Sequence, residues 1–209
     1  ISLGKIADYA NRRKNGNLVY FTVNRHVNLT NVCVGSCKFC AFRKREGEAG
    51  AYELTVEEVA EKVRGVKAHE VHVVSGLHPK WGLKEILEFI KTIKREAPQA
   101  KVQALTAEEI DYLCRKEALS VEEVLRELVE AGLDALPGGG AEIFKEELRE
   151  QLCPEKLSAE RYLEIHKTAH KFGIRSNASI LYGHVESYAD RVDHLIRLRE
   201  AQDETGGFQ

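Results

Sequence analysis

Short apolar runs rich in β-branched residues alternate along the chain with longer segments whose apolar residues recur every three or four positions. This alternation predicts strands that are each followed by a helix. The strand-like runs begin roughly 30 to 45 residues apart, which is the length of one strand–helix unit. The five predicted strands cover residues 27–32, 70–74, 101–105, 133–136 and 174–181.

The segments between these strands carry the signals of helix starts and ends. Thr55 and Ser120 are each followed three residues later by a glutamate, which is the pattern of a capping box. Gly132 and Gly173 follow amphipathic stretches, and glycine readily adopts the left-handed conformation that ends a helix. Further helices are expected over residues 2–14, over 83–93, after Ser158 and over 187–205.

Five strand–helix units with connections of this length predict a parallel sheet with helices outside it. The last two residues, Phe208 and Gln209, resemble the start of a sixth strand. A complete eight-unit barrel takes about 250 residues, whereas this chain has 209 and does not begin with methionine. We therefore expect an α/β fold in which residues 1–209 form one β/α (TIM-type) barrel domain, truncated after about five units, with the C-terminal strands missing.

Composition and charge limit the partners that the chain is expected to have. Hydrophobic residues make up 43% of the sequence and the formal net charge is −2. A packed core is therefore feasible, and electrostatics do not favour nucleic acid or an anionic membrane as a partner. No segment approaches the roughly 20 apolar residues that cross a bilayer or resembles a signal peptide, so we expect a cytoplasmic protein.

Three of the five cysteines, Cys33, Cys37 and Cys40, lie within eight residues directly after the first predicted strand. In a β/α barrel, the loops that follow the strands carry the chemistry. Thiolates are the usual ligands of iron–sulfur clusters, and three of them on a four-iron cluster leave one iron open to a small molecule. The loop 33–40 is therefore predicted to hold a [4Fe–4S] cluster.

Cysteine and histidine side chains also bind zinc or pack in protein cores. A structural zinc site needs a fourth ligand, and neither Cys114, Cys153 nor any histidine lies suitably close in sequence. A zinc-stabilised binding domain is the non-enzymatic alternative. His166 and His170 stand four residues apart, as a metal pair does, but their helix turn holds no carboxylate partner. Packing roles are expected for both histidines and for Cys114 and Cys153.

Several longer segments of the sequence resemble those of a known family. The segments around the cysteines and after the later strands are similar to the radical S-adenosylmethionine (SAM) superfamily. Within it they resemble the group that makes menaquinone by the futalosine route or the deazaflavin chromophore. These segments are residues 24–33, 37–43, 135–142, 177–184 and 199–208.

The ends of the second and third strands refine this resemblance. Residues 73–79 and 104–110 are most similar to the aminodeoxyfutalosine synthases. The sequence Val74-Ser75-Gly76 stands where those synthases usually have Val-Gly-Gly. The related dehypoxanthine futalosine cyclases and deazaflavin synthases more often have Gln-Gly-Gly there, and they form the alternative within the group.

The resemblance implies both a cofactor set and a reaction. A [4Fe–4S] cluster would receive an electron from a donor such as flavodoxin or ferredoxin, and SAM would be consumed as a co-substrate. The 5′-deoxyadenosyl radical would add to the vinyl ether of 3-[(1-carboxyvinyl)oxy]benzoate. Rearrangement and loss of carbon dioxide or bicarbonate would then give aminodeoxyfutalosine.

The resemblance also implies residues that contact SAM. Phe39, just before the third cysteine, would lie near the adenine, and the backbone of Ser75 and Gly76 would hold the methionyl amine. Glycine lets a ligand approach the backbone closely, so the run Gly138, Gly139 and Gly140 is expected to pass a flat ligand. Glu142 would then meet a ribose hydroxyl or the amine.

A dianionic substrate requires hydrogen-bond donors at the same end of the barrel. His78 and His184, after the second and fifth strands, are the candidate catalytic residues, although each is equally consistent with ordinary packing. Arg25 and His26 are placed just before the first strand. Glu108 and Glu109, after the third strand, are further polar candidates.

Overall fold

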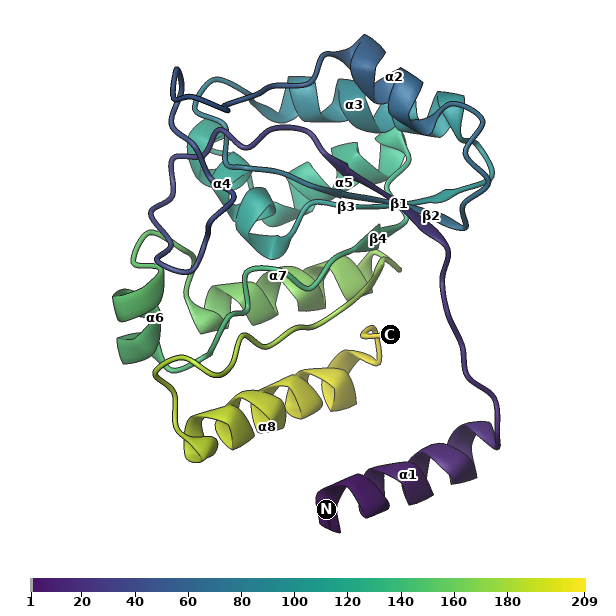
Figure 1. The fold of residues 1–209 in the computed structure, drawn as a ribbon, viewed down its shortest axis with the longest axis vertical. Helices are drawn as coiled ribbons and strands as arrows, with labels where there is room; N and C mark the ends of the chain where they lie inside the picture. The colour runs from purple at the N-terminus through teal and green to yellow at the C-terminus, as the bar shows by residue number, and fades with distance from the viewer. Residues whose placement is uncertain (1) are drawn as a thin grey trace.

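The computed structural model describes residues 2–209, and a single parallel sheet lies at its centre (Figure 1). Its five strands are hydrogen-bonded in the order in which they occur in the sequence. Parallel neighbours need long connections, and helices supply them here. The strands are β1 (Asn24–Asn28), β2 (Glu70–Val74), β3 (Lys101–Ala104), β4 (Ala135–Leu136) and β5 (Arg175–Ser176).

Helices follow the strands (Figure 1). The capping boxes predicted at Thr55 and Ser120 are both present, and Gly132 ends its helix in the left-handed conformation. The N-terminal helix covers the predicted 2–14. The helices are α1 (Ser2–Asn15), α2 (Val56–Val63), α3 (Leu83–Glu96), α4 (Ala107–Glu117), α5 (Val121–Ala131), α6 (Glu146–Leu152), α7 (Ala159–Lys171) and α8 (Tyr188–Thr205). Of these, α5 and α7 each contact helices on both sides of them, so that the contacts include α3 with α5, α4 with α5 and with α7, and α7 with α8.

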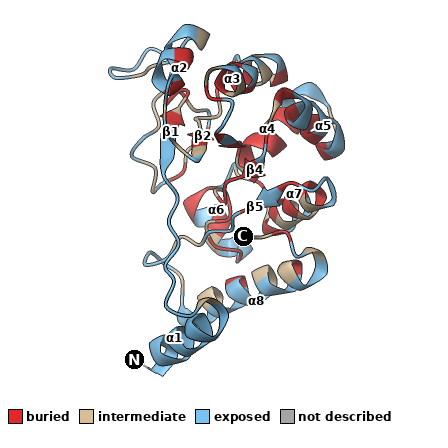
Figure 2. Cartoon of the chain, turned by 90° about the vertical axis from the view of Figure 1, so that its right-hand side faces the viewer, coloured by how far each residue is buried: buried red, intermediate tan, exposed pale blue. Residues whose placement is uncertain are grey.

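The apolar core lies between the sheet and these helices (Figure 2). Val71, Val73 and Val102 extend from the central strands, and Leu125 and Ile165 meet them from the helices; all five are buried. Burying a side chain of this size stabilises the fold by about 1.5–3 kcal/mol. The core therefore fixes the strand ends, from which the functional loops leave.

The first strand lies earlier in the chain than the predicted 27–32. β1 ends at Asn28 because the next residues pair with the loop 44–53 instead of the sheet. The hydroxyl of Thr30 donates to the carbonyl of Tyr52 at 2.6 Å, and the side chain of Asn31 bonds to Gly50 and Tyr52. Arg25 and His26, expected before the strand, consequently lie within it.

Two further strands are much shorter than predicted, and two helices were not foreseen. Pro137 follows β4 directly and has no amide hydrogen to continue a ladder. After β5 the chain leaves the sheet, where the hydroxyl of Ser179 donates to the carbonyl of Gly138. The unforeseen helices are α6 and α4, which begins at a capping box of Thr106 and Glu109 directly after β3.

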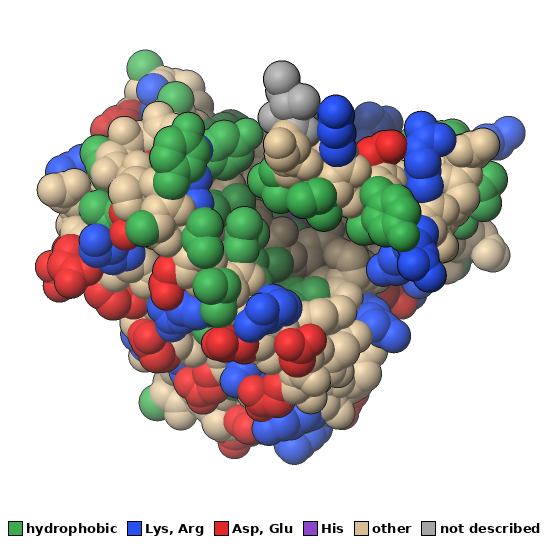
Figure 3. All heavy atoms as spheres, turned by 90° about the horizontal axis from the view of Figure 1, so that it is seen from below, with side chains coloured by type: hydrophobic (Ala, Val, Ile, Leu, Met, Phe, Trp, Pro, Cys, Tyr) green, Lys and Arg blue, Asp and Glu red, His purple; other side chains and the backbone are tan. Residues whose placement is uncertain are grey.

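The sheet of residues 2–209 is open, as expected for five units. Phe208 forms a parallel bridge with Ser176, so the predicted sixth strand begins beside β5. On the face that carries α1 and α8, hydrophobic side chains border a hollow (Figure 3). Exposed apolar residues of these helices and of the connecting segments include Leu3, Tyr20, Phe21, Tyr188 and Leu195. No helix in the described part of the chain is long and apolar enough to cross a membrane.

Candidate active site

A cavity of about 530 Å³ lies at the edge of the sheet where the strands end. Its walls come from the segments that follow β1, β2, β3 and β4 and from the loop after α6. In parallel α/β folds this edge is where ligands bind, and the volume is that of a small-molecule site. The lining includes all three clustered cysteines, Cys33, Cys37 and Cys40.

The cysteine loop 33–40 is held from three directions. The amide of Val34 donates to the carbonyl of Leu77 after β2, and the amide of Cys33 donates to Lys44. On the far side, the amide of Lys38 donates to Leu152, and Ser36 bonds to the carboxylate of Glu155 through both its amide and its hydroxyl. The backbone thus presents the cysteine side chains on one wall of the cavity.

The thiols have surroundings that suit ligation by an iron–sulfur cluster. Cys33 Sγ accepts amide hydrogens from Leu77 at 3.3 Å and from Gly35 at 3.4 Å, which hold this sulfur in place. Burial raises the pKa of Cys37 to about 11, while the charge of Lys156 opposes this rise. The Cys37 proton must therefore leave when a metal binds.

The thiols do not form a site for a single metal ion. Among residues 2–209, no three histidine, cysteine or acidic side chains converge closely enough to hold one. A four-iron cluster instead takes one thiolate at each of three separate irons, so its ligands stand farther apart around the cluster. All three thiols line this cavity, as the three protein ligands of such a cluster would.

Lys156, which the sequence pattern did not single out, lies beside the cysteine loop, in the loop after α6. Its ammonium is 2.6 Å from the carboxylate of Glu142, and both side chains are less than one-fifth exposed. Burial alone would lower the pKa of Lys156, but the charges of Glu142 and Cys37 outweigh it and raise the pKa. Lys156 also lies over the ring of Phe39, at 5.7 Å, so a fixed positive charge lies beside the cysteine loop.

The segment after β2 lies close to the first cysteine. A Cβ atom at Gly76 would stand 2.3 Å from the carbonyl oxygen of Val32, so only glycine allows this approach. The carboxylate of Glu109 accepts hydrogen bonds from the backbone of Thr106 and Ser75, and it lines the same cavity. Ser75, Gly76 and Glu109 thus form one wall.

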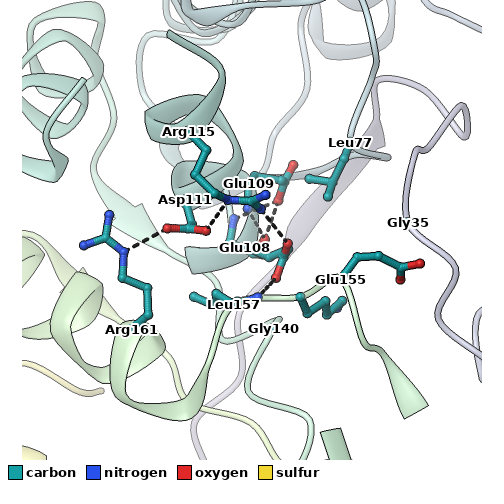
Figure 4. A network of polar contacts seen from close by, with 12 residues as sticks. Gly35, Leu77, Glu108, Glu109, Asp111, Arg115, Gly140, Glu155, Leu157 and Arg161 are labelled. Carbon is teal, nitrogen blue, oxygen red and sulfur yellow. Dashed lines mark hydrogen bonds and ion pairs between the residues drawn. The ribbon is translucent and has the colours of Figure 1, made fainter. Parts of the chain in front are cut away.

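A network of charged side chains surrounds Glu108 and Arg115, which line the cavity from α4 (Figure 4). Asp111 on α4 joins Arg115 and Arg161 through contacts of 2.8 Å each. Glu108 accepts the amide hydrogen of Leu157 at 3.0 Å through one oxygen, while its other oxygen has no hydrogen-bond partner among the described residues. Burial raises the pKa of Glu108, and Lys156 opposes the rise.

Two of the three glycines in the run 138–140 line the cavity, and the third has a packing role. Gly138 lies outside the lining, and its carbonyl accepts hydrogen bonds from the hydroxyls of Tyr162 and Ser179. Gly139 and Gly140 do line the cavity, and Gly140 has a φ of +96°. The structure therefore brings Gly139, Gly140 and Glu142 to the cavity and uses Gly138 for packing.

The two candidate histidines lie beside the cavity and are absent from its lining. His78 is buried against Trp81, and its Nδ1 accepts the amide hydrogens of Lys80 and Trp81. His184 is exposed, with its ring centre 6.2 Å from that of Phe39. The ring of His78 bonds the turn before α3, which is the packing role that the sequence left open for it.

The remaining cysteines and the histidine pair are packing residues, as expected. Cys114 is buried in the main core, and Cys153 is buried in the small cluster that contains Cys37. His166 and His170 both bond to the hydroxyl of Ser176, at 2.8 and 2.7 Å. These bonds join α7 to β5, and none of the four residues lines the cavity.

The charge of Glu109 gives the protein a measurable pH dependence. Burial raises the pKa of Glu109 from 4.5 to about 7, so the folded state binds this proton more tightly than the unfolded state. The contribution of Glu109 to the free energy of unfolding should therefore fall as the pH rises from 4.5 to 7, by at most about 3 kcal/mol. Burial lowers the pKa of His166 and of His194, and both raise the free energy of unfolding over the same range. The Glu109 contribution is therefore read from the difference between wild type and Glu109→Gln, which keeps a capping residue, and denaturant titrations at pH 5, 6 and 7 should show this difference falling as the pH rises.

A matched control for this substitution lies at the equivalent position of α5. Glu123 bonds to Ser120 in a capping box of the same kind but is exposed. The difference between wild type and Glu123→Gln should not change between pH 5 and 7. A difference between wild type and Glu109→Gln that is equally independent of pH would contradict the assignment of a buried, titrating Glu109.

Sequence comparisons place the chain among enzymes of one superfamily. The family model of the radical SAM superfamily matches residues 27–198. The chain is 45% identical over 99% of its length to an aminodeoxyfutalosine synthase of Thermus thermophilus. It is 43% identical over 92% of its length to a 5-amino-6-(D-ribitylamino)uracil–L-tyrosine 4-hydroxyphenyl transferase of Methanopyrus kandleri. The chain spans about half the length of these relatives, 56% and 53% respectively.

Solved structures show the same fold at lower sequence identity. The methylornithine synthase structure matches 96% of this chain and 56% of its own, with a TM-score of 0.75 and 19% identity. The structure of a maturase of the [FeFe]-hydrogenase matches 96% of this chain and 43% of its own, with a TM-score of 0.68 and 20% identity. With the family model covering most of its length, the chain belongs to the radical SAM superfamily, whose cofactors are a [4Fe–4S] cluster and SAM.

Proposed function

We propose that this chain is the cluster- and SAM-binding part of an aminodeoxyfutalosine synthase. The proposed reaction joins the adenosyl group of SAM to 3-[(1-carboxyvinyl)oxy]benzoate, with loss of carbon dioxide or bicarbonate, in menaquinone synthesis. The observation that carries the enzyme class is the cavity at the strand ends, with three cysteines on one wall. The identity of 45% to the Thermus thermophilus synthase supports the specific reaction.

Cys33, Cys37 and Cys40 are the proposed ligands of the cluster. When bound, the cluster supplies the electron that cleaves SAM into methionine and a 5′-deoxyadenosyl radical. The protein itself excludes water and holds the reactants in place. The cysteine loop has backbone bonds to segments after β2 and after α6, which keep the wall rigid around the reaction.

SAM is proposed to lie between the cysteines and the segments after β2 and β4. The backbone of Ser75 and Gly76 and the carboxylate of Glu142 are the proposed contacts of its polar groups, with Phe39 beside the adenine. Gly139 and Gly140 let a flat ligand approach the backbone, because neither presents a side chain to the cavity. Gly138 contributes by fixing this segment rather than by touching the ligand. His184, near Phe39, stays a candidate for substrate contact.

A second candidate function is supported by the identity of 43% to the hydroxyphenyl transferase of Methanopyrus kandleri. That function would take tyrosine and 5-amino-6-(D-ribitylamino)uracil as substrates. The cavity is compatible with both, since each function needs the same cluster and SAM. Only a test with each set of substrates can therefore distinguish the synthase from the transferase.

The deciding experiment is anaerobic reconstitution of the protein with iron and sulfide, a reductant such as flavodoxin or ferredoxin, and each substrate set in turn. We expect a product mass that contains the adenosyl group together with the benzoate. Free 5′-deoxyadenosine formed in step with a tyrosine-derived adduct would instead establish the transferase. No iron–sulfur absorbance after reconstitution would overturn both functions.

A further inference from the structure

Three cationic side chains line the cavity, and two of them are already neutralised. Lys156 pairs with Glu142 at 2.6 Å, and Arg115 contacts Asp111 at 2.8 Å and Glu108 at 3.8 Å. Arg43 lines the same cavity, three residues after Cys40. Within residues 2–209, its guanidinium takes part in no ion pair within 4.0 Å and no side-chain hydrogen bond.

The position of Arg43 is set by the backbone hydrogen bonds of the residue that follows it. The amide of the next residue, Lys44, donates to the carbonyl of Asn31 at 2.8 Å, and the carbonyl of Lys44 accepts from the amide of Cys33 at 3.0 Å. Arg43 is therefore fixed next to the cysteine loop. Its Nε atom is buried and without a hydrogen-bond partner.

An unpaired buried donor on a charged group is costly unless a ligand satisfies it. A guanidinium presents Nε–H and one Nη–H side by side, in a geometry that matches the two oxygens of a carboxylate. The neighbouring lining is apolar and aromatic, with Phe39, Phe42 and Val34. The wall around Arg43 thus combines one unpaired cation with surface that suits the hydrocarbon part of an organic acid.

We propose that Arg43 binds a carboxylate of a ligand in this cavity through a bidentate hydrogen-bonded pair. This inference rests on the proposed function for the identity of the ligand. The carboxylate belongs either to the second substrate or to SAM. Both substrate sets considered above contain such a group, on the benzoate or on tyrosine, so the inference does not depend on which of the two reactions is correct.

The test is equilibrium binding to the reconstituted holoprotein without reductant, so that no turnover takes place. The probes are SAM, 3-[(1-carboxyvinyl)oxy]benzoate and tyrosine, each titrated calorimetrically into wild type, Arg43→Gln and Arg43→Lys. We expect Arg43→Gln to weaken one carboxylate ligand about 10- to 100-fold. Arg43→Lys should restore part of that loss, since it keeps the charge but not the bidentate fork.

If Arg43→Gln weakens the binding of only the benzoate or tyrosine, the proposal is supported and the carboxylate belongs to the second substrate. If it weakens the binding of only SAM, the proposal is supported and the carboxylate belongs to SAM. Unchanged affinity for every probe that wild type binds would overturn it. So would an equal loss for all probes accompanied by loss of iron in both variants, because Arg43 would then be structural. Arg126, exposed on α5, gives the control Arg126→Gln for removing one positive charge.

These outcomes separate the inference from the proposed function. A wild-type protein that binds SAM but neither benzoate nor tyrosine would count against both proposed reactions, while the SAM titration would still decide the role of Arg43. A wild-type protein that binds the benzoate and forms the adenosyl product, with affinities unaffected by Arg43→Gln, would leave the function standing and remove the inference.

Discussion

Replacement of any one of Cys33, Cys37 and Cys40 with serine is expected to remove the iron–sulfur absorbance and reduce SAM cleavage to background. All three thiols lie on one cavity wall, and a cluster that keeps one iron open for SAM has no spare protein ligand. The loss should exceed the roughly 10- to 100-fold that changes next to metal ligands cost. The measurements are iron and sulfide content after anaerobic reconstitution, and methionine release under reducing conditions.

The two other cysteines provide matched controls for this prediction. Cys114 is buried in the main core, and Cys153 is buried beside Cys37. A buried thiol packs as a small hydrophobic group, so Cys114→Ala and Cys153→Ala should retain iron, sulfide and SAM cleavage. A single serine variant of the triplet that keeps a full cluster and wild-type cleavage would show that the cluster is bound elsewhere.

The parts of the fold that were predicted correctly are those with local signals. β2 was predicted at its observed limits, because its β-branched run is bounded by Ser75 and Gly76. The caps at Thr55 and Ser120 were predicted because both of their hydrogen bonds join residues three apart. Local bonds of this kind are visible in a single segment of sequence.

Boundaries set by distant contacts were not predicted. β1 ends at Asn28 because Thr30 and Asn31 bond to a loop about 20 residues away. β5 ends at Ser176 because the next residues follow the glycine segment after β4. Apolar periodicity reports which residues can be buried, but it does not report which segment will cover them.

In the candidate site, too, the residues with local sequence signals were predicted, and those that depend on distant contacts were not. The cysteines and Gly76 were identified because their spacing and their place after a strand carry the chemistry. Lys156 and Arg43 lie in loops without periodic pattern, and their importance arises from the charges around them in the folded chain. The direction of the His78 ring could not be predicted for a related reason, since a position after β2 fixes the backbone but not the side chain.

Arg149 was likewise not singled out by any pattern in the sequence. It is 3% exposed, and its guanidinium donates to the carbonyls of Gly140, Ala141, Ile143 and Leu157 at 2.5–3.2 Å. These carbonyls belong to the two segments that carry Glu142 and Lys156 into the cavity. Arg149 is therefore a positioning residue for the part of the cavity wall that carries Glu142 and Lys156.

Arg149→Met is expected to lower the free energy of unfolding by about 3–5 kcal/mol, because four buried carbonyls would lose a charged donor. The same variant should also bind SAM more weakly, since the segments of Glu142 and Lys156 are no longer joined. Urea denaturation and calorimetric titration of SAM measure the two effects. Arg149→Lys should recover part of the stability, because an ammonium can reach some of these carbonyls but not all four.

Arg126→Met is the control, since Arg126 is exposed and its removal should change the free energy of unfolding by no more than about 0.5 kcal/mol. A change below about 1 kcal/mol for Arg149→Met would contradict the role given to the four carbonyl bonds. A large loss of stability without weaker SAM binding would confine Arg149 to folding. Weaker binding in Arg149→Lys, at nearly wild-type stability, would show instead that the geometry of the guanidinium itself positions the cavity wall.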